Sequence, residues 1–132
     1  MNASSVDIRY MLEDEEDLGL VFGGNLFVSR EPASPANCVT IYDAPGGGVD
    51  LTAQGQSERY YRNDVQVRVR NVSYITAWAL CHSIMDRLHA RAGETWNDTF
   101  YALITCVQPP FVLTWDENNR VITVVNFKIQ RR

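Results

Sequence analysis

The feature that most restricts the fold of this chain is an alternating segment followed at once by an amphipathic one. In residues 64–71, three valines alternate with Gln66, Arg68 and Arg70, as in a strand with one buried face. Residues 73–92 then place their apolar side chains within one broad arc at helical spacing. Because a half-buried strand leads directly into a helix with one apolar face, the pair predicts a helix packed on a sheet.

A second helix and further strands follow from the same periodicities. Apolar residues share one side at helical spacing over residues 6–17, and Ser4 and Asp7 have the spacing of a capping box at the start of that helix. We therefore expect an α+β fold, with two main helices packed on one face of an antiparallel (mixed) sheet. The strand patterns occur at residues 25–29, 37–43, 100–107, 111–115 and 120–129.

The length of 132 residues is that of one domain, and we expect a single domain over residues 1–132. Residues 44–63 contain Pro45 and three consecutive glycines and show no periodicity, which predicts a long flexible loop. No apolar run approaches the roughly 20 residues of a membrane helix. The first seven residues lack the basic and apolar parts of a secretion signal. We therefore expect no membrane partner, and a protein retained in the cytoplasm or in a particle assembled there.

Residues with catalytic or metal-binding chemistry are few and poorly placed. Cys38, Cys81 and Cys106 are odd in number and widely spaced, which favours neither a disulfide framework nor a zinc site. His82 and His89 share a helix face, but no third ligand is offered at the next turn. The adjacent Cys81 and His82 point about 100° apart on a helix and cannot share a proton. The sequence therefore predicts no catalytic residue, no metal site, no cofactor and no enzyme.

The charged residues form blocks of opposite sign. The whole chain has a net charge of −4, yet residues 1–24 carry −5, residues 59–91 carry +4, and residues 120–132 hold four cations and no acid. A negative net charge disfavours nucleic-acid binding as the main function. Blocks of opposite sign at different places on one subunit suit head-to-tail self-association, and the alternative is that they form only solvated surface.

Nine residues of these blocks are candidates for a subunit or partner interface. Tyr10 belongs to a small apolar strip on the first helix that a monomer would leave partly exposed. The acids at the end of that helix oppose its dipole, so a solvated surface or a contact with arginines of a neighbouring subunit would suit them. The arginines near the alternating strand can form the wet face of a sheet, grip carboxylates or lie near DNA phosphates. The candidates are Tyr10, Glu13, Asp14, Glu16, Asp17, Arg59, Arg62, Arg68 and Arg70.

Three segments together carry a resemblance to a known family. The first is Val39-Thr40-Ile41-Tyr42-Asp43 with its Pro-Gly-Gly turn. The second is Tyr60-Tyr61 with the alternating strand and an alanine-rich helix, and the third is the closing strand at 122–129. Over roughly residues 5–130 the chain resembles the small phage proteins labelled minor capsid protein, which are similar to the tail terminator (tail completion) proteins of long-tailed bacteriophages.

The resemblance implies a structural virion protein with helices packed on an antiparallel sheet. It implies a hexameric ring that caps the tail tube, stops its polymerisation and joins the tail to the head connector. The implied partners are further copies of the chain, the tail tube protein and the connector or neck protein, with DNA passing without sequence specificity. The implied location is the tail or neck of a virion assembled in the host cytoplasm.

Two other functions stay open at this point. The chain can be a head-side neck or head-completion protein at the same junction, with its basic strand near exiting DNA. It can also be a small thiol hydrolase built around Cys81, His82 and His89, which would require a reactive cysteine of low pKa.

Overall fold

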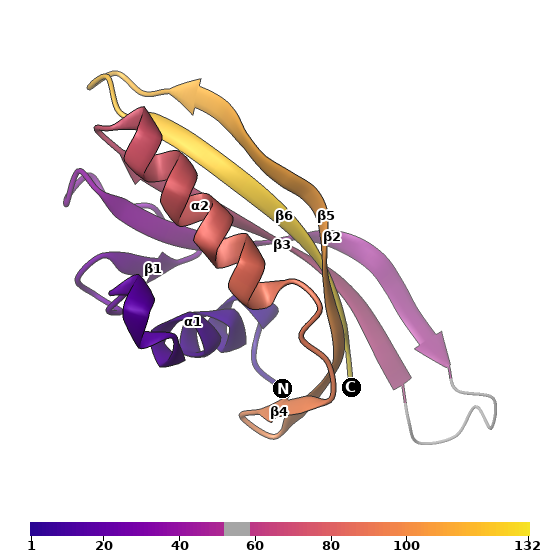
Figure 1. The fold of residues 1–132 in the computed structure, drawn as a ribbon. Coiled ribbons are helices and arrows are strands. Elements are labelled where there is room, and N and C mark those ends of the chain that lie inside the picture. Colours follow the sequence, from indigo (N-terminus) through magenta and orange to yellow (C-terminus); the bar gives the residue numbers. More distant parts are fainter. Residues whose placement is uncertain (52–58) are drawn as a thin grey trace.

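The structure is a computed structural model that describes residues 1–51 and 59–132. Its six-stranded sheet has the order β1-β2-β3-β6-β5-β4, in which β1 and β2 are parallel and the other neighbours antiparallel. Figure 1 shows both α-helices on one face of this curled sheet, which confirms the predicted α+β class. The elements are α1 (Ser4–Asp14), the 3₁₀ helix η1 (Glu16–Leu18), β1 (Leu26–Val28), β2 (Cys38–Leu51), β3 (Arg59–Asn71), α2 (Tyr74–Leu88), β4 (Glu94–Trp96), β5 (Thr99–Trp115) and β6 (Val121–Arg131).

The core lies between the helices and the inner face of the sheet. The three valines of β3 face α2, as their alternation predicts, and Val65 and Val67 stand opposite Phe127 and Val125 of β6. The side chains that α2 buries recur at helical spacing, so its apolar arc covers the sheet. Each large aliphatic side chain buried there contributes about 1.5–3 kcal/mol to folding. The fully buried residues of α2 are Ala77, Cys81, Ile84 and Leu88.

The start of α1 differs from the predicted capping box. The helix begins at Ser4, and its N-cap residue Ala3 offers no side-chain hydrogen bond. The backbone N–H of Ser5 instead donates to the Asp43 carboxylate of β2 at 3.0 Å, and the Ser5 hydroxyl donates to the same carboxylate at 2.6 Å. Asp7 is fully buried and accepts hydrogen bonds from Tyr101 Oη and from Asn97 Nδ2. One free backbone donor of the helix terminus, the Ser5 N–H, is thus satisfied from the sheet.

Most of the predicted loop at residues 44–63 is a β-hairpin. Residues 44–51 belong to β2 and residues 59–63 to β3, so the prediction of irregular structure is wrong for both; residues 52–58 lie outside the described part of the chain. The two strands pair on both sides of a bulge between Ala44 and Gly48. A Cβ at Gly46 would clash with the Arg62 carbonyl oxygen and lie 2.8 Å from Asn63 Cα. The glycines that suggested a loop therefore permit a close backbone approach.

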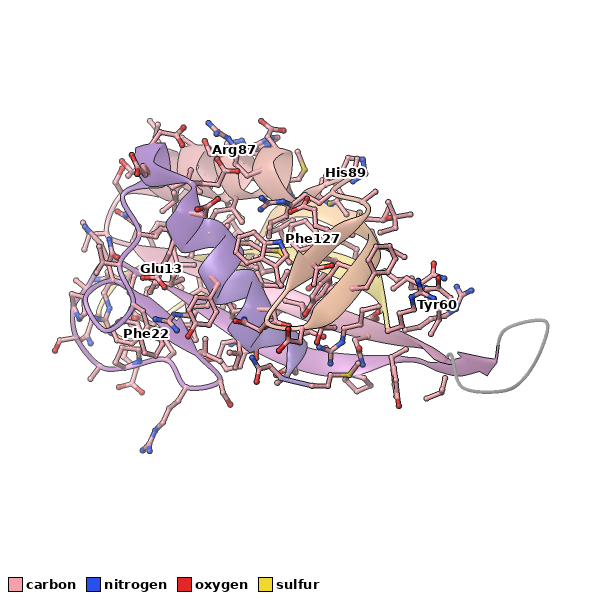
Figure 2. The ribbon with its side chains drawn as sticks, turned by 90° about the horizontal axis from the view of Figure 1, so that it is seen from below. Glu13, Phe22, Tyr60, Arg87, His89 and Phe127 are labelled. Carbon is pink, nitrogen blue, oxygen red and sulfur yellow. The ribbon has the colours of Figure 1, made fainter. Side chains whose placement is uncertain are left out.

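We call residues 44–51 and 59–64 the arm. Figures 1 and 2 show that it extends beyond the part of the sheet that the helices cover. Its outer part also passes the end of β6, whose pairing with β3 stops at Tyr61 and Arg131. The outermost pairs of the arm, Asp50 with Tyr60 and Leu51 with Arg59, are therefore two-stranded and project beyond the core of their own subunit.

The last three predicted strands also need correction. A break was expected at Pro109-Pro110, but β5 continues through both prolines to Trp115. Register shifts on either side of the prolines keep the strand paired with β6, and as part of an edge the prolines need no partner for their missing N–H groups. The short strand β4, which was not predicted, pairs with β5 only over Thr99–Tyr101.

Candidate subunit interface

The acidic cluster lies at the C-terminal end of α1 and in η1, and part of it is neutralised within the subunit. Glu13 forms an ion pair with Arg9 at 2.7 Å, one turn earlier on α1. Glu15 and Asp17 both bind the guanidinium group of Arg87 on α2, the former at 3.0 Å. These contacts tie the end of α1 to the neighbouring helix. They also remove Glu13 and Asp17 from the set of unpaired acids.

Asp14 and Glu16 are the candidate acids that stay unpaired. Both are exposed, and neither forms an ion pair with any residue of the ranges that the structure describes. Asp14 is the last residue of α1, where the partial negative charge of the helix dipole disfavours a carboxylate. A cation from another molecule would relieve that repulsion.

An apolar patch adjoins the acids. Tyr10 is 40% exposed, and Val21 and Phe22 are also exposed. The guanidinium carbon of Arg9 lies 4.2 Å from the ring centroid of Tyr10 and 3.9 Å from that of Phe22, which holds the two rings beside one charge. We call Tyr10, Asp14, Glu16, Val21 and Phe22 the acidic end.

The predicted arginines divide into different environments. Arg62 on the arm is exposed. Arg68 is half-buried: its Nε donates to Gln66 Oε1 at 2.7 Å, and its guanidinium group lies 4.8 Å from the ring centroid of Tyr42. Arg59 begins β3, but its side chain is outside what the structure describes. Arg62 and Arg68 lie on the sheet face that the helices leave open.

Arg70 does not form part of a wet sheet face; of the alternatives left open for the arginines, it binds a carboxylate, and that carboxylate belongs to its own subunit. Its side chain is only 4% exposed, because the segment between β1 and β2 folds over it. It donates to Glu31 Oε1 at 2.7 Å, to the Pro35 carbonyl at 2.7 Å and to the Ala36 carbonyl at 3.2 Å. Arg70 therefore anchors a segment of its own subunit.

Two cations that the sequence did not single out complete the basic region. Lys128 and Arg132 are both exposed, and Lys128 stands opposite Asp64 of β3 and Thr105 of β5. The run of four cations in residues 120–132 was the available signal. The register of β6 places Lys128 on the face of Arg62, and the guanidinium carbon of Arg132 lies 5.5 Å from the ring centroid of Tyr60 on the arm. We call Arg62, Arg68, Lys128 and Arg132 the basic surface.

The acidic end and the arm lie at opposite ends of the subunit. Figure 2 shows Glu13 and Phe22 at one end and Tyr60, which is on the arm, at the other. The exposed acids and the cations near the arm therefore do not meet within one chain. Such a separation allows contacts of opposite sign between successive copies.

A third exposed feature, which the sequence reasoning missed, follows the outer part of β5. Val107, Phe111, Leu113 and Trp115 are all exposed, Trp115 by 52%. Beyond Tyr101 this strand has no β4 partner. The apolar run at 111–115 after the two prolines is the sequence signal for this feature, although by itself the run predicts only a strand.

Comparison with known proteins gives the family. A family model described as "Bacteriophage tail terminator protein" matches residues 8–132. The chain belongs to this family. A chain of the solved structure "Virion of native gene transfer agent (GTA) particle" has the same fold, with a TM-score of 0.68 and 13% identity, covering 98% of this chain and 94% of that one. No curated protein matches the sequence.

Membership of the tail terminator family confirms the predicted resemblance and places the protein among the structural components of the phage virion. Neither of the described helices is long and apolar enough to cross a membrane. Within the described ranges, no three His, Cys, Asp or Glu side chains are grouped to hold a metal ion.

The three residues of the alternative thiol enzyme, Cys81, His82 and His89, lie in different environments. Cys81 is fully buried in the core, and burial raises the pKa of its thiol to about 12. His82 lies beside the ring of Trp78, with 5.2 Å between centroids, and His89 Nδ1 accepts a hydrogen bond from the Cys106 backbone N–H at 2.9 Å. A thiol with such a raised pKa is protonated at neutral pH, and a protonated thiol is a poor nucleophile.

Proposed function

We propose that the protein is the tail terminator of a long-tailed phage. It forms a hexameric ring on the last tier of the tail tube, stops the growth of the tube and presents its other face to the head connector. The observation that carries this proposal is the match of the tail terminator family over residues 8–132, nearly the whole chain.

The physical properties of the subunit agree with a ring. A closed ring of identical subunits needs a heterologous interface, in which one patch meets a different patch on the next copy. The acidic end and the basic surface are two such patches, and their opposite signs would favour one orientation of approach. The arm extends beyond its own core, so a neighbouring subunit or the tube can supply the contacts that its far end lacks.

The open face of the sheet carries positive charges that can contact DNA. Arg62, Arg68 and Lys128 lie on the face that the helices do not cover. Cations on a lumen-facing surface attract phosphates without reading base sequence. We propose that the part of this face around Arg68 lines the channel through which DNA passes, either in the tail terminator ring or, in the alternative function, in a head-side neck ring.

Addition of the purified protein to polymerising tail tube protein tests the function. We expect tube growth to stop, and native mass spectrometry should detect six copies on each capped tube. Tubes that continue to lengthen at saturating protein would contradict the proposal. Electron microscopy of purified particles separates the two junction functions, because a density on the head side of the connector would identify a neck protein instead.

A further inference from the structure

Lys128 is an unpaired cation within the basic surface. Its ammonium group forms no ion pair with any side chain in residues 1–51 or 59–132, whereas the acid-bound arginines of the subunit, such as Arg70 and Arg87, are held by two or more groups each. An exposed lysine without a partner is ordinary on a protein surface. Its position in a pocket is what makes this one a candidate site.

The pocket spans three adjacent strands on the open face. It has a volume of about 110 Å³, which suits a small group such as a carboxylate. The strand register brings its residues together, because Arg62 stands opposite Gln130 on β3 and β6, and Lys128 stands opposite Thr105 on β6 and β5. Two cations, a hydroxyl and an amide therefore surround the opening, and an apolar side chain forms part of the wall. The lining residues are Arg62, Leu103, Thr105, Lys128 and Gln130.

The chemistry of the lining selects an acidic side chain. Lys128, Thr105 and Gln130 can hydrogen-bond the oxygens of a carboxylate. Arg62 adds a positive charge, and Leu103 can contact the methylene groups that precede the carboxylate. A continuous row of DNA phosphates fits less well, because the small pocket holds one anionic group and Asp64, opposite Lys128 on the neighbouring strand, would repel further negative charges beside it. The net charge of −4 opposes the same partner.

The subunit itself carries matching carboxylates at its opposite end. Asp14 and Glu16 are exposed and unpaired within the described residues, and Asp14 also lies where the dipole of α1 disfavours it. We propose that the pocket of Arg62 and Lys128 binds the carboxylate of Asp14 or Glu16 from the neighbouring copy. This inference rests on the proposed ring and assigns its interface: the acidic end of one subunit meets the open face near the arm of the next.

A charge swap tests the assignment, with ring formation measured by native mass spectrometry and sedimentation velocity, alone and with tail tubes. Lys128→Glu should raise the protein concentration at half-assembly by about tenfold or more, because it places like charges in the contact. The combined variant Lys128→Glu, Asp14→Lys, Glu16→Lys should recover assembly, because each interface of the ring then regains opposite charges.

The matched controls reverse charges elsewhere on the exposed surface. Arg30→Glu and Asp86→Lys change the net charge by the same amounts outside both patches, and we expect both variants to assemble as the unchanged protein does. Circular dichroism confirms that every variant is folded. Raised salt should weaken assembly of the unchanged protein and matter less for Lys128→Ala.

The possible results distinguish failure of the proposed interface from failure of the proposed ring. If the unchanged protein forms rings and Lys128→Glu does so equally well, the pocket is not the interface and only the inference is overturned. The inference is also overturned if the charge swap fails to recover assembly. It is likewise overturned if Lys128→Glu leaves assembly unchanged and weakens only the binding of a DNA duplex of about 30 base pairs, or about three helical turns. If the unchanged protein never forms a ring, even on tube ends, the proposed function fails as well.

Discussion

Removal of the Arg70 side chain should destabilise the folded subunit far more than removal of the neighbouring Arg68. Both arginines lie on β3 two residues apart and face the same side of the sheet. Arg70 is 4% exposed and donates to the Glu31 carboxylate and to the carbonyls of Pro35 and Ala36. Arg70→Ala would leave a largely buried carboxylate and two carbonyl oxygens without their donor.

The magnitude follows from these contacts. Breaking a buried ion pair by removal of one partner costs about 3–5 kcal/mol, because the other charge is left uncompensated. Glu31 retains some access to water, with a side chain 16% exposed, so we expect the lower half of this range, about 3–4 kcal/mol. Arg68→Ala loses one hydrogen bond to Gln66 and a partly solvated contact with an aromatic ring, together about 1–1.5 kcal/mol.

Urea unfolding of dilute protein, followed by circular dichroism, measures both costs. With a urea dependence of about 2 kcal/mol per molar, Arg70→Ala should lower the midpoint by about 1.5–2 M and Arg68→Ala by about 0.5–0.7 M. In a double-mutant cycle, Glu31→Ala should cost little more once Arg70 is already absent. Equal midpoints for Arg70→Ala and Arg68→Ala would refute the assigned burial and pairing of Arg70.

Three further predictions concern other parts of the subunit. Gly46→Ala should disrupt the arm and abolish assembly with little loss of core stability, because its Cβ would clash with the β3 backbone. Gly47→Ala is the control, because its Cβ would only touch a side chain, and hydrogen exchange compares the two variants. Tyr101→Phe should lower the free energy of unfolding by about 1–3 kcal/mol in thermal or urea melts, because the buried Asp7 carboxylate loses a donor. Cys81 should not react with a thiol reagent at pH 8 until the protein unfolds, since burial holds its pKa near 12; rapid labelling of the folded protein would contradict this.

The elements that the sequence predicted well are those in which one periodicity governs a whole segment. The alternation on β3 and the apolar arc of α2 placed the core correctly, because burial of one face produces those patterns directly. Proline and glycine were less informative. Pro109-Pro110 and Gly46 predict breaks, but both lie within strands. Gly46 permits a close backbone approach at a bulge, and the two prolines stand where no N–H donor is needed.

The environment of single polar residues could not be predicted, because it depends on partners that are distant in sequence. Arg68 and Arg70 follow the same alternation, yet only Arg70 is covered, by a segment more than 30 residues earlier in the chain. Asp7 fits the pattern of a capping residue, but its donors Asn97 and Tyr101 come 90 and 94 residues later in the chain. Local spacing indicates which contacts a side chain can make, but tertiary packing determines whether those contacts form.

Folding also determines which charges of the blocks stay unpaired. The sequence shows six acids and one cation in residues 1–24, but folding brings Arg87 to Glu15 and Asp17 and pairs Glu13 with Arg9. What distinguishes Asp14 and Glu16 is therefore that they stay exposed and unpaired within the described residues after folding. An exposed ion pair within a monomer contributes little, whereas a charge pair that becomes desolvated between subunits can specify orientation. Because charges that are already neutralised within the subunit contribute less to assembly, the interface should be sought at Asp14, Glu16 and the Lys128 pocket before Arg68 and Arg70.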